Sequence, residues 1–184
     1  MNSGKMLAVA DSCFLIDWAK YKKRDIIRDI FKSVFITIDV MKEITSEETL
    51  SMISDYLADG FFVPITLSDT EREKVHELMI SYARDNQAPA IHEPEASAVV
   101  FALNHGIEIV LSENTALKYH HQIRKNPDVW GASDVLKKAL IDDLITTSNI
   151  KKEFETYSQE TKHLFRKKDI EKEIKEIENI KKVK

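Results

Sequence analysis

The chain has few of the residues that build covalent or flexible frameworks. Its 184 residues include one cysteine, four glycines and four prolines. The single cysteine, Cys13, excludes an intramolecular disulfide and a cysteine-rich zinc site. No apolar run approaches the roughly 18 residues that a membrane-spanning helix needs, and the amino-terminal run is too short for a signal peptide. We therefore expect a soluble cytoplasmic protein, without membrane association, that is long enough to bury an ordinary core.

Charge is distributed unevenly along the chain. The formal net charge is −4, yet residues 151–184 hold 11 Lys/Arg and 8 Asp/Glu, against 16 and 23 in the preceding residues. An acidic body argues against a general nucleic-acid coat protein, because such proteins bind through a basic face. It permits a site built from clustered carboxylates. We expect a folded domain over residues 1–149 and a charged helical extension over residues 150–184.

Short apolar runs alternate with segments of helical periodicity. The runs are typical of buried strands, and they lie at residues 6–10, 34–38, 61–65, 107–111 and 129–130. Pro64 favours an edge position or an irregular segment for the third run. Ser68 and Glu71 have the spacing of a capping box, which predicts a helix start. The alternation predicts an α/β fold with a mainly parallel sheet and helices on both faces.

The clearest stretch is HEPEASAVVFALNHGIEIVLSENTAL, residues 92–117. Pro94 suits the first turn of a helix, whose apolar stripe recurs every three to four residues until Gly106. The apolar run that follows has the length of a buried parallel strand. Glu95 lies at the start of the helix and Glu113 at the carboxyl end of the strand, where open α/β sheets bind ligands.

Two more acids occupy comparable positions. Asp11 follows the first strand, where it can also cap the next helix. Glu43 follows the second strand, in the first turns of a helix that Asp39 is expected to cap, and there it also favours the helix dipole. In a parallel sheet all four acids can converge on one edge. Like charges so close need a cation, and oxygen-only ligands select Mg²⁺ or Mn²⁺ rather than zinc.

In these segments the chain resembles the PIN domain family. The matching segments are VADSCFLI, VFITIDVMKEI, EPEASAVVFALNHGIEIVLSEN and VWGASDVLKKAL, and they span about residues 6 to 142. The order and spacing of the acids are the most specific part of the resemblance. It implies a three-layer α/β/α fold with a divalent metal at four catalytic acids, which are Asp11, Glu43, Glu95 and Glu113.

The resemblance also implies hydrolysis of phosphodiester bonds, usually in RNA. Many small prokaryotic members are toxin ribonucleases of toxin–antitoxin modules, so an antitoxin is one implied partner. Ser12 would match the small hydroxyl residue that often follows the first aspartate. The family commonly has aspartate at the third or fourth position, whereas this chain has glutamate at both. Asn114 stands where some members have another aspartate, and Glu93 is an alternative ligand to Glu95.

Two basic segments flank the acids and are candidates for binding RNA. The basic side chains proposed for this role are Lys22, Lys23, Arg24, Lys118, Arg124 and Lys125. Tyr21 and Tyr119 lie within these segments, where they can stack on unpaired bases. The alternative is that both segments are ordinary solvated helix ends. Ser12 and Asp17 with a distant histidine do not make a hydrolytic triad without geometry.

The carboxyl-terminal segment has a narrow apolar stripe formed by Ile170, Ile174 and Ile177. One interpretation is a solvated helix that packs back weakly. The other is a helix that docks on a partner protein or on a second copy, and the family's habits favour a homodimer. The sequence thus supports a metal-dependent endoribonuclease. The alternative is a catalytically impaired PIN-like binding or assembly module that acts through this helix.

Overall fold

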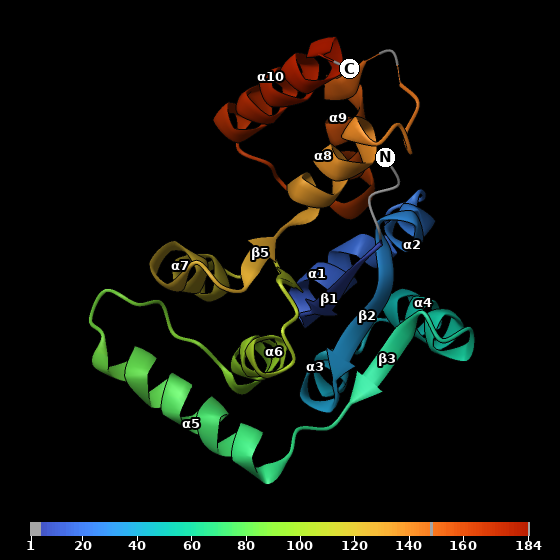
Figure 1. The fold of residues 1–184 in the computed structure, drawn as a ribbon. Helices are drawn as coiled ribbons and strands as arrows, with labels where there is room; N and C mark the ends of the chain where they lie inside the picture. Colours follow the sequence, from blue (N-terminus) through green and yellow to red (C-terminus); the bar gives the residue numbers. More distant parts are fainter. Residues whose placement is uncertain (1–4, 148, 184) are drawn as a thin grey trace.

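A five-stranded parallel sheet forms the centre of the computed structural model, which describes residues 5–147 and 149–183 (Figure 1). The strand order is β3-β2-β1-β4-β5. The strands are β1 (Met6–Ala10), β2 (Phe31–Thr37), β3 (Phe62–Ile65), β4 (Ile109–Leu111) and β5 (Asp128–Trp130). The predicted α/β fold is confirmed. Pro64 lies in β3 at the edge of the sheet, where its missing N–H costs no ladder hydrogen bond.

Helices cover both faces of the sheet, as the alternation of side chains along the strands requires. Ala8 and Ala10 of β1 belong to one core cluster, and Val9 between them belongs to the other. The first cluster includes side chains of α1 (Ser12–Ala19), α2 (Ile27–Ile30), α4 (Glu47–Ala58) and α8 (Ala132–Ile141). The second includes side chains of α5 (Asp69–Arg84), α6 (Glu93–Asn104) and α7 (Thr115–Arg124). None of the helices in the described residues is long and apolar enough to cross a membrane.

The carboxyl-terminal segment forms two helices, α9 (Ile150–Thr161) and α10 (Lys167–Val183), at the top of Figure 1. Phe154, Tyr157 and Ile177 are buried in the first core cluster. The ring of Tyr157 lies 5.8 Å from that of Trp18 and 5.1 Å from that of Tyr21. The segment is therefore a helix pair that packs against α8 and the end of α1. The division at residue 149 stays a prediction.

Two of the predicted helix starts can be compared with the structure. Ser68 and Glu71 form the expected capping box of α5. The expected cap at Asp39 is wrong: α3 (Ile38–Glu43) is capped by Thr37, whose hydroxyl accepts a hydrogen bond from the Val40 amide at 3.2 Å. The helix therefore starts earlier than expected. Glu43 is the last residue of this six-residue helix.

Candidate active site

The carboxyl ends of β2, β1 and β4 lie side by side, because these strands are neighbours and parallel. Asp11 directly follows β1, and Ser112, Glu113 and Asn114 directly follow β4. The edge therefore collects polar side chains from segments that are far apart in the sequence.

Asp11 is the most buried acid at this edge, with 1% of its surface exposed. Its Oδ1 accepts from the Ser12 amide at 2.8 Å. Its Oδ2 accepts from the Cys13 thiol and the Ser112 hydroxyl, each at 2.8 Å. Burial raises the pKa of Asp11, these hydrogen bonds oppose the rise, and the charge of Glu43 adds to it.

Glu43 is linked to Asp11 through one intervening residue, Ser12, whose backbone amide binds Asp11 and whose hydroxyl binds Glu43. The Ser12 hydroxyl donates a hydrogen bond of 2.6 Å to the Glu43 Oε2. Because Ser12 is the first residue of α1 and Glu43 the last residue of α3, this bond joins two helix ends. The Ser12 hydroxyl thus binds a carboxylate, and among the residues that the structure describes it has no histidine partner.

Glu95 completes the group from the first turn of α6, where it is 9% exposed. The Asn114 side-chain amide donates to its Oε1 at 2.6 Å, and the His92 amide donates to its Oε2 at 3.1 Å. Burial is the main cause that raises the pKa of Glu95, and the charges of Asp11 and Glu43 add to it. We call Asp11, Glu43 and Glu95 the acid trio, since their charges act on one another.

The Glu113 carboxylate binds groups outside the acid trio. Its Oε1 accepts from the Ala132 amide at 2.6 Å, and its Oε2 accepts from the Lys118 ammonium at 2.8 Å. Gly131 allows this approach, because a Cβ there would lie 2.6 Å from the Glu113 Oε1. The structure thus brings three of the four predicted acids together and directs the fourth toward the start of α8.

The sequence did not predict Cys13, Ser112 or His163 as site residues. Cys13 and Ser112 donate to Asp11, and their places beside the predicted acids were the available signal. His163 lies between α9 and α10, and its Nδ1 is 3.3 Å from the Asp17 Oδ2. No local pattern pointed to it. Glu93 is exposed at the start of α6.

A match to a known family shows the family to which the chain belongs. A family model described as a PIN domain, DUF3368, matches residues 7–178. The chain belongs to the PIN-domain family. No curated protein sequence matches it. PIN domains are generally nucleases and typically use divalent metals.

The acid trio of this PIN domain suits a hard cation by the chemistry of its donors, which are all carboxylate oxygens. Within residues 5–147 and 149–183, however, no three His, Cys, Asp or Glu side chains are arranged to hold one metal ion. Hydroxyl, thiol and amide donors occupy the carboxylates of Asp11 and Glu95. A bound ion would have to displace part of these hydrogen bonds.

The basic side chains proposed for RNA binding have different surroundings. Lys23 pairs with Glu153 of α9 at 2.8 Å, and Lys22 lies 3.5 Å from Glu160. Arg24 donates to the Ala19 carbonyl at 2.7 Å. The expected stacking of Tyr21 on bases is wrong, because this ring is fully buried and its hydroxyl donates to Glu153 at 2.6 Å.

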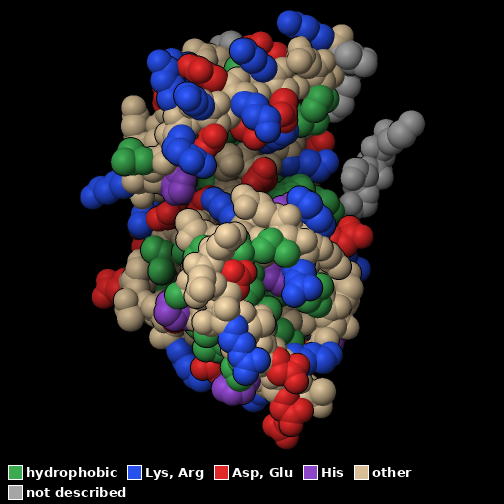
Figure 2. All heavy atoms as spheres, turned by 90° about the vertical axis from the view of Figure 1, so that its left-hand side faces the viewer, with side chains coloured by type: hydrophobic (Ala, Val, Ile, Leu, Met, Phe, Trp, Pro, Cys, Tyr) green, Lys and Arg blue, Asp and Glu red, His purple; other side chains and the backbone are tan. Residues whose placement is uncertain are grey.

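The second basic segment lies on α7. Lys118 pairs with Glu113, and the Tyr119 hydroxyl donates to Asp85 at 2.8 Å. Arg124 and Lys125, at the end of this helix, are exposed. Figure 2 shows Lys and Arg side chains interspersed with Asp and Glu over the upper part of one face, where the carboxyl-terminal helices lie. That part of the surface is therefore of mixed charge.

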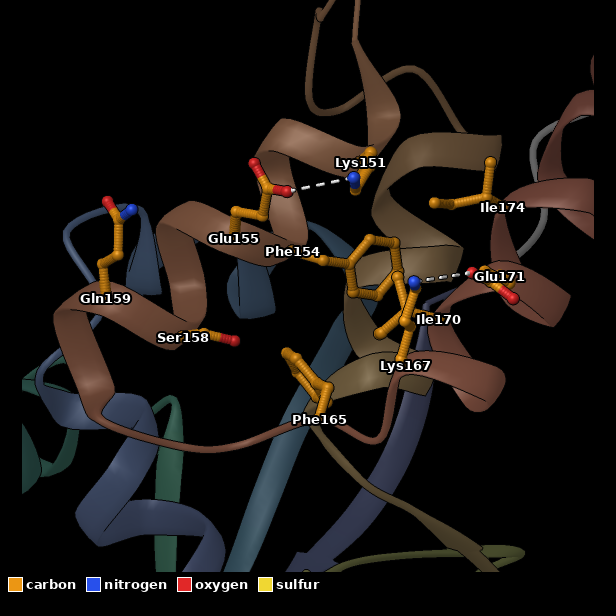
Figure 3. A pocket seen from close by; sticks show the side chains of 10 residues that line it. All are labelled: Lys151, Phe154, Glu155, Ser158, Gln159, Phe165, Lys167, Ile170, Glu171 and Ile174. Atoms are coloured by element: carbon orange, nitrogen blue, oxygen red, sulfur yellow. Dashed lines mark ion pairs between the residues drawn. The ribbon is translucent and has the colours of Figure 1, made fainter.

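A groove of about 410 Å³ lies between α9 and α10 (Figure 3). Its apolar lining consists of Phe154, Phe165, Ile170 and Ile174. Two ion pairs border it, Lys151 with Glu155 at 3.5 Å and Lys167 with Glu171 at 4.0 Å. The groove is separate from the acid trio.

Proposed function

We propose that this PIN domain is a divalent-metal-dependent endoribonuclease. The acid trio is the observation that carries the proposal. Two of its carboxyls are buried, and the three negative charges act on one another at the carboxyl edge of the sheet. Buried like charges are costly unless a cation neutralises them. Asp11 and Glu95 also cap helices, but capping does not offset the repulsion among three acids.

Different residues would bind the metal ion, position its carboxylate ligands and bind the RNA. Asp11, Glu43 and Glu95 would hold Mg²⁺ or Mn²⁺, and the ion when bound supplies Lewis acidity toward the phosphate and a water molecule. Ser12, Ser112 and Asn114 fix the carboxylates through hydrogen bonds of 2.6 to 2.8 Å. Glu113 would have to release Lys118 to join the other three acids as a ligand. The exposed Arg124 and Lys125 would hold the RNA backbone.

Cleavage of a mixed single-stranded RNA tests the proposal. We expect purified protein to cut in Mn²⁺ or Mg²⁺, to stop in chelator, and to lose the activity in Asp11→Asn. Calorimetry with Mn²⁺ should show binding to the wild-type protein and weaker binding to the variant. Absence of both cleavage and metal binding in the wild-type protein would overturn the enzyme proposal.

A narrower proposal is that the protein is the toxin of a toxin–antitoxin module. The family resemblance supports it. A short open reading frame directly upstream of the coding sequence, together with growth arrest on expression that Asp11→Asn abolishes, would establish it. Growth unaffected by an active enzyme would exclude it.

A second candidate function is an assembly module that works through the carboxyl-terminal helices. The apolar groove favours it, and each lysine at its border pairs with a glutamate of the same chain. Such a neutral border suits a second copy better than a strongly charged partner. We expect Ile174→Asp to convert a homodimer to a monomer in sedimentation, whereas Ile180→Asp, outside the groove on the same helix, should not. A wild-type protein that is monomeric at all concentrations would contradict this.

A further inference from the structure

The short connection between α9 and α10, residues 162–166, brings a histidine to the edge of the sheet. The His163 Nδ1 lies 3.3 Å from the Asp17 Oδ2, and its Nε2 lies 4.0 Å from the Glu113 Oε2. Asp17 comes from α1 and Glu113 from the loop after β4. The ring therefore stands between two acids that belong to different segments.

Local contacts fix the position of this ring. Lys162 ends α9 in the left-handed conformation with φ 62°. The His163 amide donates to the Thr161 hydroxyl at 3.1 Å, and that hydroxyl donates to the Tyr157 carbonyl at 2.9 Å. The ring of Phe165 lies 4.7 Å from that of His163. Since the His163 side chain is only 19% exposed, few of its rotamers are accessible.

The Glu113 carboxylate is confined on its other sides. The Ala132 amide and the Lys118 ammonium occupy its two oxygens, and Gly131 lies against Oε1. Lys118 is a long side chain, 46% exposed, and such ion pairs constrain geometry weakly. His163 is better fixed, because Asp17 and the connection hold it.

We propose that His163 is a positioning residue, oriented by Asp17, that fixes the Glu113 carboxylate at the start of α8, on the same edge of the sheet as the acid trio. The carboxyl-terminal helix pair would thereby contribute to the active site from 50 residues along the chain. The effect on catalysis rests on the proposed nuclease function. The effect on the position of Glu113 does not.

Three substitutions of His163 distinguish the contributions of its two ring nitrogens. An asparagine amide lies near the place of Nδ1, so His163→Asn keeps the contact with Asp17 and loses the reach toward Glu113. A glutamine amide lies near the place of Nε2, so His163→Gln keeps that reach. We expect kcat to fall about 10-fold to 100-fold in His163→Ala and His163→Asn, with KM for RNA changed by less than about twofold. His163→Gln should recover part of the loss.

Leu164→Ala is the matched control, because Leu164 lies in the same connection, is 88% exposed and has an apolar side chain that cannot form a hydrogen bond with these acids. It should leave kcat unchanged. Melting temperatures close to that of the wild-type protein would show that all variants fold. If His163→Ala does not fold, the Asn and Gln variants still decide, because both retain a polar side chain of similar size.

Amide exchange of Ala132 provides a second readout that needs no activity. This amide donates to Glu113, so it should exchange faster in His163→Ala and His163→Asn and at the wild-type rate in Leu164→Ala. Unchanged exchange of Ala132 would overturn the proposal, as would wild-type kcat in all three His163 variants. If the wild-type protein cuts no RNA, the nuclease proposal fails and the exchange of Ala132 alone decides the role of His163.

Discussion

Glu43 illustrates how a single residue separates a structural role from a functional one. A glutamate at the beginning of a helix is stabilised by the helix dipole, but Glu43 is the last residue of α3. At that end the dipole disfavours a negative charge. Its side chain accepts a hydrogen bond from the hydroxyl of Ser12, beside Asp11. Helix stability therefore does not account for an acid at this position, whereas the proposed binding of a cation would.

Glu95 and Glu93 form a matched pair for testing the acid trio. Both lie in the first turn of α6, but Glu95 is buried against Asn114 and Glu93 is exposed. We expect Glu95→Gln to lower the rate of RNA cleavage about 100-fold, because a ligand charge is lost. Glu93→Gln should remain within about threefold of the wild-type protein. Equal losses in the two variants would contradict the assignment of Glu95.

Ionisation of the Glu71 carboxyl should make the stability of the folded protein depend on pH. Glu71 is 8% exposed, and hydrogen bonds from Ser68, Asn104 and His105 lower the pKa of its carboxyl to about 2 despite burial, which opposes the shift. Because its folded pKa lies below the ordinary value, its contribution is complete above about pH 4.5 and is lost as the pH falls toward 2.

Glu71→Gln should therefore lower the free energy of unfolding by about 2 kcal/mol at pH 7. The difference from the wild-type protein should shrink as the pH falls from 5 toward 2. Urea denaturation at several pH values measures it, with Glu73→Gln, exposed on the same helix, as the control. A difference that does not vary with pH would contradict the assigned pKa.

At the scale of elements, the junction between β5 and α8 places Glu113. Gly131 is the N-cap residue of α8, and its amide donates to the Asp134 carboxylate at 2.8 Å. Burial raises the pKa of Asp134 to about 6. The next amide, of Ala132, is left for the Glu113 carboxylate. The amino terminus of α8 thus orients Glu113, an acid that follows β4.

Gly131→Ala tests this junction. Its backbone, at φ −89° and ψ −177°, is extended and suits alanine, but the new Cβ would displace the Glu113 Oε1. We expect a melting temperature near that of the wild-type protein and a cleavage rate lowered about 10-fold.

Gly106→Ala should show the reverse pattern. Gly106 has φ +64° with no atom near a Cβ, so alanine there should cost about 1 kcal/mol of stability and leave the cleavage rate unchanged. Loss of activity in both variants, or in neither, would show that the approach to Glu113 is not the cause.

On the scale of the whole molecule, α9 is held by both a core contact and a polar one. Tyr157 packs against Trp18 and Tyr21. Glu153, 5% exposed, accepts from the Tyr21 hydroxyl at 2.6 Å and from Lys23 at 2.8 Å. The basic loop after α1 thereby binds α9.

A chain that ends at residue 149 tests whether residues 1–149 are an independent domain. Removal of the rest would expose Trp18 and Tyr21 and leave Lys23 without its partner. Each large side chain that loses its cover costs about 1.5–3 kcal/mol, so we expect the truncated chain to unfold or aggregate near 37 °C. A cooperative thermal transition close to that of the full chain would instead establish the division.

The sequence by itself determined the features that depend on neighbouring residues. The strands and their parallel arrangement, the capping box of Ser68 and Glu71, and the edge position of Pro64 follow from local periodicity and backbone chemistry. The placing of Asp11 and Glu95 at strand and helix ends follows in the same way.

Only the tertiary structure decided the direction of each carboxylate and the partners of the carboxyl-terminal helices. Glu113 turns toward α8 because the Ala132 amide and the space beside Gly131 lie there. Tyr21 is buried against Glu153, 132 residues away, and Asp17 meets His163, 146 residues away. The local sequence pattern determines the helix or strand on which a residue lies. Contacts between distant segments fix what its side chain touches, and no local spacing encodes them.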